Sequence, residues 1–144
     1  MRVLIALAVL LNLPSVPAGA AWQVHTSTDR MTDRPVTDAS LRVPGATLHL
    51  HCEMGPTIRV DAPLPPRSDI GVNYRFDQRA LVPRMVFVST DGRNLRPWMG
   101  APRAGLQAVA RAKRLRLEIF GPSGVQFLDF DLTGAREALA KACP

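Results

Sequence analysis

The chain has 144 residues, two cysteines and a formal net charge of +6, from 18 Lys and Arg side chains against 12 Asp and Glu. This length favours a single domain with a modest hydrophobic core over a multidomain protein. No apolar run of about 18 residues follows the N-terminal segment, which excludes a transmembrane helix from the body of the chain.

The N-terminal segment has the organisation of a secretory signal peptide. An arginine precedes an apolar run over residues 3–13 that is too short to span a bilayer as a helix, and prolines end this run. Residues 18–20, Ala-Gly-Ala, are the small side chains that a signal peptidase requires. We therefore expect cleavage after Ala20, and no lipid anchor because no cysteine follows it. The mature chain, residues 21–144, is then a single periplasmic or secreted domain.

The first half of the mature chain is expected to form strands and turns. Pro44-Gly45 is a turn signal, and the alternation of apolar and polar residues over 46–52 predicts a strand. Gly55-Pro56 predicts another turn, after which 57–61 returns as the second strand of a hairpin. The remaining segments are a strand at 22–29, a loop at 29–35 and an extended Pro-rich connection at 63–66.

The second half combines strands with two helices. Alternation is clearest over 70–77, whereas 85–88 is apolar on both faces and predicts a central strand. Apolar residues at helical spacing predict a short helix at 104–112 and a C-terminal helix, with Thr133 as its N-cap. The other segments are a polar turn at 89–92, an irregular stretch at 94–102, and hairpin strands at 115–119 and 128–132 around a turn at 121–124.

These elements predict an α+β fold dominated by antiparallel β-sheet, with a sandwich-like arrangement. Cys52 and Cys143 are the only cysteines, and in an exported chain they are most simply one disulfide, which would tie the C-terminal helix to the sheet. Closing a loop of about 90 residues is worth roughly 4 kcal/mol on the chain-entropy model. A metal thiolate or a catalytic thiol is the alternative, but each needs further ligands or a reducing compartment.

Three patterns could carry catalysis or bind a metal, and each also has an ordinary explanation. His49, His51 and Glu53 share one face of a strand, which is a possible zinc site or simply a solvated face. Asp129 and Asp131 share another face, where they are either a glycosidase carboxylate pair or two solvated acids. Ser89 and Asp91 could join a histidine in a triad, but no nucleophile elbow surrounds Ser89 and Asp91-Gly92 is typical of a turn. We therefore expect a protein without enzymatic activity or cofactor.

Four residues are candidates for ligand binding. Arg75 and Asp77 lie on one face of a strand, where they would form a local salt bridge or present a guanidinium to a carboxylate ligand. Trp98 would fold onto the core or serve as an exposed platform for a sugar ring. Asp91 is the fourth candidate, because it lies in one of the short motifs described below.

The basic character of the mature chain points to an anionic partner. Without Arg2 it has 17 basic residues against 12 acidic ones. Exported proteins do not normally meet nucleic acid, so the cell wall, lipopolysaccharide and phospholipid headgroups are the polyanions to consider. An arginine-rich composition that serves solubility alone is the alternative.

Several short motifs occur in a suggestive order. They are Asp29-Arg-Met-Thr-Asp33, Leu48-His-Leu-His-Cys52, Val72-Asn-Tyr-Arg-Phe-Asp77, Val88-Ser-Thr-Asp-Gly92 and Phe130-Asp-Leu-Thr-Gly134. In this order they resemble the VasI/TagO-like family of exported accessory proteins of type VI secretion systems. The chain differs from the family pattern at Phe87-Val88, where relatives often have a tryptophan, and after Cys143, where only Pro144 follows.

The resemblance implies a non-enzymatic periplasmic protein that binds peptidoglycan and helps to seat a secretion-system membrane complex in the wall. Peptidoglycan or another anionic envelope component is therefore the expected partner, together with secretion-system membrane-complex proteins. The alternative is a secreted inhibitor that acts on a wall hydrolase or a host factor through a protruding loop, for which 94–102 is the candidate. A small hydrolase or metal-dependent enzyme would instead need the histidines or the aspartate pair to line a pocket.

Overall fold

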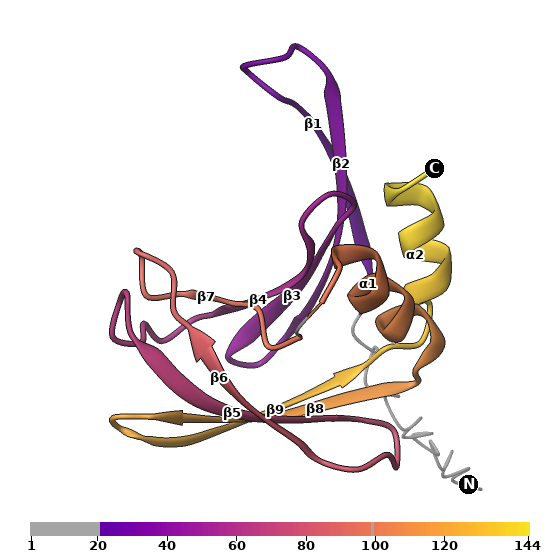
Figure 1. The fold of residues 1–144 in the computed structure, drawn as a ribbon. Helices are drawn as coiled ribbons and strands as arrows, with labels where there is room; N and C mark the ends of the chain where they lie inside the picture. Colours follow the sequence, from indigo (N-terminus) through magenta and orange to yellow (C-terminus); the bar gives the residue numbers. More distant parts are fainter. Residues whose placement is uncertain (1–20, 99) are drawn as a thin grey trace, which may run out of the picture.

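The structure is a computed structural model that describes residues 21–98 and 100–144. The predicted signal peptide lies outside the described residues. Two antiparallel sheets face each other and two helices close one end of the space between them (Figure 1). This confirms the predicted α+β, sandwich-like fold.

The first sheet has five strands in the order β1-β2-β3-β4-β7. Its alternating inward side chains, such as Ala39, Leu41, Leu48 and Leu50, are fully buried, as the period of two requires. Its strands are β1 (Gln23–Thr28), β2 (Pro35–Val43), β3 (Ala46–His51), β4 (Gly55–Val60) and the two-residue β7 (Asn94–Leu95). The β1–β2 hairpin projects beyond the rest of the sheet in Figure 1, and every residue of β1 is exposed.

The second sheet has four strands in the order β6-β5-β8-β9. Its strands are β5 (Asp69–Phe76), β6 (Val82–Phe87), β8 (Arg114–Gly121) and β9 (Gly124–Asp131). Val72, Ile119 and Phe130 point inward and are at most 1% exposed. The alternate residues of all four strands point away from the core and form the outer face of this sheet.

Helices α1 (Pro102–Arg111) and α2 (Ala135–Ala142) complete the core. Leu106 and Val109 of α1, and Ala135, Ala138 and Ala142 of α2, are buried with the inward residues of both sheets. Proline occupies the first turn of α1, where its missing N–H costs nothing. Within the described residues, neither helix is long and apolar enough to cross a membrane.

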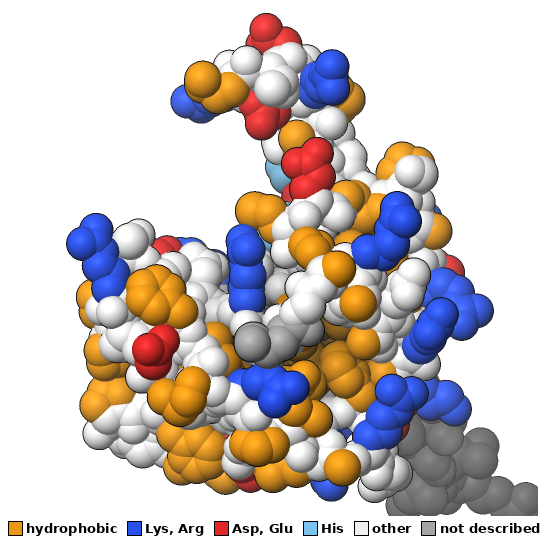
Figure 2. Space-filling view, in the orientation of Figure 1, with side chains coloured by type: hydrophobic (Ala, Val, Ile, Leu, Met, Phe, Trp, Pro, Cys, Tyr) orange, Lys and Arg blue, Asp and Glu red, His pale blue; other side chains and the backbone are white. Residues whose placement is uncertain are grey.

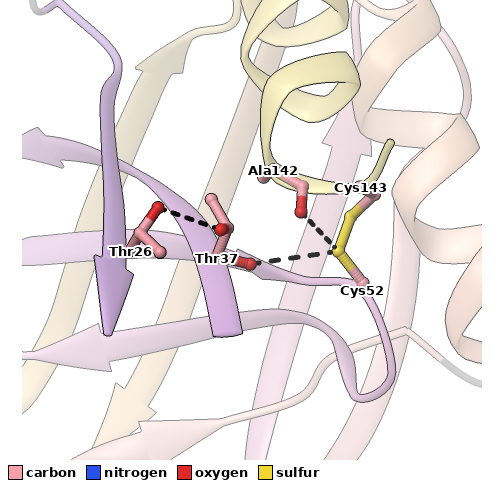
Figure 3. Close-up of a disulfide and its surroundings, with 5 residues drawn as sticks. All are labelled: Thr26, Thr37, Cys52, Ala142 and Cys143. Carbon is pink, nitrogen blue, oxygen red and sulfur yellow. Dashed lines mark hydrogen bonds between the residues drawn. A yellow bond between two sulfur atoms is a disulfide. The ribbon is translucent and has the colours of Figure 1, made fainter. Parts of the chain in front are cut away.

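A disulfide joins Cys52, in the turn after β3, to Cys143, the residue that follows α2 (Figure 3). This confirms the predicted pairing and leaves no free cysteine among the described residues. Without the bond, α2 would be held to the sheet mainly by three small alanines, which bury little apolar area. The disulfide therefore fixes the helical end of the fold and fits an oxidising, non-cytoplasmic location.

Four local predictions differ from the structure. Strand β2 was not predicted, although Ala39, Leu41 and Val43 alternate. Gly55-Pro56 begins β4 instead of forming a turn, and the chain reverses at 52–54. Pro56 is tolerated at the start of this strand because no backbone N–H is required from it there. The strand at 85–88 is not central: β6 pairs only with β5 and lies at the sheet edge. Thr133 does not cap α2; Gly134 precedes the helix with φ 85°, and the Thr133 hydroxyl donates to Asp131.

Candidate functional site

The outer face of the four-stranded sheet exposes apolar side chains where solvated polar ones are expected. Phe127 is 71% exposed and Met85 66%, and the other exposed apolar side chains of this face are Phe87, Phe120 and Val125. In Figure 2 apolar side chains extend along the lower part of the molecule, where this sheet lies. Contiguous exposed apolar surface of this kind marks binding sites more often than chance.

Strand register arranges the outer face in three rows. The first row is apolar and runs from Met85 across Gly71 and Phe120 to Val125. Gly71 leaves room for a neighbour: a Cβ at that position would lie 3.4 Å from Cδ2 of Phe120. The aromatic ring therefore lies beside bare backbone at the centre of the sheet.

The second and third rows become progressively more polar. Asn73 and Glu118 are cross-strand neighbours, and the Asn73 Nδ2 donates to Glu118 Oε2 at 3.0 Å. Phe127 stands opposite Glu118 on the edge strand β9. In the third row Arg75 lies directly opposite Arg116, which in turn lies opposite Asp129.

A shallow depression of about 490 Å³ lies over these two rows. Its polar lining consists of Asn73, Arg75, Arg116, Glu118 and Asp129, while Phe127 and Leu81 supply apolar walls. An aromatic ring beside guanidinium and carboxylate groups on an open sheet provides a stacking surface and directional hydrogen bonds together.

The two arginines in the depression differ in how they are paired. Asp129 receives two hydrogen bonds from Arg114, at 2.7 and 2.6 Å, and lies 3.8 Å from Nε of Arg116. Among the described residues Arg75 has no ion pair or side-chain hydrogen bond. Like charges directly opposite each other on neighbouring strands are destabilising. An anion placed between Arg75 and Arg116 would relieve that repulsion.

Of the four predicted ligand-binding residues, only Arg75 lies in this depression. Asp77 follows β5 with φ 51°, and its Oδ1 accepts hydrogen bonds from the backbone N–H groups of Lys113 and Arg114, both at 2.9 Å. The local salt bridge to Arg75 is absent from the described residues. Asp77 therefore holds the start of β8.

Trp98 and Asp91 lie outside this depression and have structural contacts. The Trp98 Nε1 donates to the carbonyl of Pro56 at 2.6 Å, and its ring meets Tyr74 edge to face. Asp91 accepts from the Ser89 hydroxyl and from the Arg93 backbone, and it pairs with Arg59 at 3.2 Å. The Ser89 hydrogen bond is the main reason that the pKa of Asp91 falls to about 2. This network organises the turn, and among the described residues no histidine is hydrogen-bonded to Ser89.

The histidine pattern lies on the outer face of the five-stranded sheet. His49 and His51 stack with their ring centroids 5.7 Å apart, and Nδ1 of His49 lies 3.8 Å from Asp38. Burial lowers the pKa of His49, and neighbouring His51 lowers it further. Glu53 is in the turn after β3 and so does not share the strand face as predicted. Within the described residues no group of three or more His, Cys, Asp or Glu side chains could hold a metal ion.

The predicted carboxylate pair is divided between two local contacts. Asp129 binds Arg114, whereas Asp131 accepts hydrogen bonds from the side chain and the backbone of Thr133, which lower its pKa. Sequence reasoning missed Phe120, Phe127 and Met85, although the signal was present. Phe127 precedes Asp129 and Asp131 on the polar side of β9's alternation, which is an unusual place for an aromatic ring.

Comparisons with protein-family models, with curated protein sequences and with solved structures find no match to this chain.

Proposed function

We propose that this protein is a non-enzymatic cell-envelope module that binds an anionic glycan strand of the peptidoglycan type. The binding site is the depression on the outer face of the four-stranded sheet. Phe127 stacks on a sugar ring, and Arg75 and Arg116 bind carboxylates of the ligand through their planar guanidinium groups. The resemblance to type VI secretion accessory proteins adds the proposal that wall binding seats a membrane complex.

One observation carries the proposal: an arginine that has no ion pair among the described residues lies opposite a second arginine and near an exposed phenylalanine. Arg75 and Arg116 are adjacent in register, and Phe127 is 71% exposed in the lining of the same depression. A surface that only contacts solvent needs neither two arginines opposite each other nor the exposed ring. An elongated anionic sugar chain can satisfy both when it lies along the outer face of the sheet.

Co-sedimentation with isolated peptidoglycan sacculi tests the proposal. We expect the oxidised mature protein to pellet with sacculi at low salt and much less at high salt, because the arginine contacts are screened. Arg75→Ala and Phe127→Ala should each weaken pelleting by about tenfold, which corresponds to roughly 1.4 kcal/mol. Arg34→Ala, at the exposed tip of the β1–β2 hairpin, removes the same charge away from the depression and is the matched control.

Two results would contradict the proposal. Wild-type protein that does not pellet at low salt has no affinity for the wall. Equal loss of pelleting in Arg34→Ala and Arg75→Ala would show that total charge, and not the depression, determines binding.

A second candidate is a protein partner, such as a wall hydrolase that this protein inhibits. The observation that favours it is the apolar row of Met85, Phe120 and Val125, which is larger than a sugar ring needs. In the predicted contact loop at 94–102, Leu95 and Pro97 are buried and Trp98 is half-buried, so these three side chains offer little contact surface. The apolar row would be the contact surface instead.

Muramidase assays separate the two candidates. A glycan-binding module should slow the digestion of sacculi, because it covers the polymer, yet leave cleavage of a short soluble oligosaccharide unchanged. An inhibitor of the enzyme would slow both reactions, and Phe120→Asp would abolish that inhibition.

A further inference from the structure

The net positive charge of the described chain is concentrated on its helical layer. Residues 102–113 and 135–142 contain five of the 17 basic side chains that remain without Arg2, but only one of the 12 acidic ones. The sheets and loops carry the other twelve basic and eleven acidic side chains and are nearly neutral. Figure 2 shows basic side chains gathered on the right of the molecule, where α1 and α2 lie in Figure 1. The five basic residues are Arg103, Arg111, Lys113, Arg136 and Lys141.

A groove of about 530 Å³ runs between the two helices at this basic surface. Leu106, Leu139 and the Cys52–Cys143 disulfide supply its apolar lining. Arg103 of α1 and Arg136 of α2 line the same groove. Neither arginine has an ion pair with another described residue. The groove thus combines apolar surface with two guanidinium groups that are free to bind an anion.

We propose that this groove binds the headgroups of anionic phospholipids at a bilayer surface. A phosphate would lie between Arg103 and Arg136, since guanidinium groups bind phosphate oxygens in pairs of hydrogen bonds. The glycerol and first acyl carbons of the same lipid would contact Leu106 and Leu139. An amphiphilic anion satisfies the charged and the apolar lining together, which a fully polar polyanion does not.

The surface around the groove favours shallow, reversible membrane contact. Neither α1 nor α2 has an exposed large apolar side chain, so the helices cannot insert deeply into the acyl region. The exposed positions include Ala104 and Ala140, which allow close approach to a flat surface. The helical layer also lacks the aromatic side chains that dominate protein–protein hot spots. Binding should therefore be electrostatic and sensitive to salt.

Vesicle co-sedimentation tests this site with the oxidised mature protein. Phosphatidylcholine vesicles are compared with vesicles containing roughly one third phosphatidylglycerol, because each basic residue near an anionic bilayer contributes about fivefold to binding. We expect binding to the anionic vesicles only, a loss of about fivefold for Arg103→Ala or Arg136→Ala, and about 25-fold for the double variant. Arg30→Ala/Arg34→Ala, at the exposed hairpin tip, makes the same change of charge and should retain binding. Thermal unfolding of each variant verifies that it is folded.

Further measurements distinguish a lipid site from a free phosphate site. Leu139→Gln keeps the charge but replaces apolar lining, and it should weaken vesicle binding. Inorganic phosphate and sodium chloride are compared at the same ionic strength, and phosphate should displace the protein from vesicles no better than sodium chloride does. Stronger competition by phosphate, together with unchanged binding by Leu139→Gln, would overturn the lipid assignment.

The remaining outcomes also decide the proposal. Absence of binding to anionic vesicles, or equal loss in the helical and hairpin double variants, would overturn it. The site does not depend on the proposed glycan-binding face: Arg103→Ala/Arg136→Ala should pellet with sacculi as the wild type does, and Phe127→Ala should bind vesicles as the wild type does. Failure of one site is therefore distinguishable from failure of the other.

Discussion

The outward faces of the two sheets differ in how their side chains are satisfied. On the five-stranded sheet, charged groups pair with one another: Arg42 binds Asp61 at 2.8 Å, Arg59 binds Asp91 and His49 lies near Asp38. On the four-stranded sheet, Arg114 binds Asp129 at 2.6 Å, but Arg75 has no ion pair among the described residues and Phe127 is 71% exposed. Both faces come from the same alternation of inward apolar and outward residues. This difference supports the proposal that the outer face of the four-stranded sheet contacts a partner.

Removal of the disulfide should have the largest effect on stability and should leave the outer face of the four-stranded sheet intact. In Cys52→Ser/Cys143→Ser the unfolded chain loses a constraint on about 90 residues, so the free energy of unfolding should fall by roughly 4 kcal/mol. Urea unfolding of the oxidised protein and the double variant measures this difference. Reductant should lower the free energy of unfolding of the wild type by the same amount and leave that of the double variant unchanged. A change below about 1 kcal/mol would show that packing alone holds α2 to the five-stranded sheet.

Two aromatic substitutions separate structure from binding. Trp98 is half-buried, donates to Pro56 and contacts Tyr74, so Trp98→Ala should cost about 2 kcal/mol of unfolding free energy. Phe127→Ala should change stability by less than about 0.5 kcal/mol, because its ring is mostly exposed. Urea unfolding and sacculus pelleting of both variants make the comparison. A large loss of stability in Phe127→Ala would mean that the ring stabilises the sheet by packing and is not reserved for a ligand.

The sequence predicts which residues of the two sheets are buried better than it predicts how their outward faces are arranged. Alternation placed Leu48, Leu50, Val72 and Ile119 in the core, because the period of two depends on local geometry alone. It could not place β6 at an edge, since strand order depends on pairing between distant segments. For this reason Met85 was expected in the interior, although it is 66% exposed.

The candidate site required the same long-range information. Arg75 could be recognised from sequence as an outward arginine, but its position opposite Arg116 follows from the pairing of β5 with β8. Trp98 and Asp77 were expected as possible ligand contacts because their residue types suit binding. Their actual roles depend on Pro56, Lys113 and Arg114, which no local pattern links to them.

Asp77, which follows β5 beside the proposed binding face, provides a smaller structural test. Its carboxylate accepts two backbone hydrogen bonds, and Asp77→Ala should cost about 1.5 kcal/mol of unfolding free energy. Asp77→Asn keeps an acceptor and tolerates the positive φ, so it should recover most of this loss. Both variants are compared by urea unfolding, with sacculus pelleting as a second readout. If Asp77→Asn unfolds like the wild type but no longer pellets with sacculi, the Asp77 carboxylate contacts the ligand, as the sequence predicted.

The outer face of the five-stranded sheet should respond to acid through His49. Burial and the nearby His51 lower the pKa of His49 in the folded state below its ordinary value of 6.5. Between this lowered pKa and about 6.5, the unfolded chain binds the proton more readily than the folded one. The free energy of unfolding should therefore decrease as pH falls below about 6.5. Asp38 opposes the shift, which keeps the effect small, and Arg59 reinforces it. Urea unfolding at neutral and mildly acidic pH, compared with His49→Gln, measures this slope. An equal slope in His49→Gln would assign the pH dependence to other groups, whereas a flatter one would assign it to the protonation of His49.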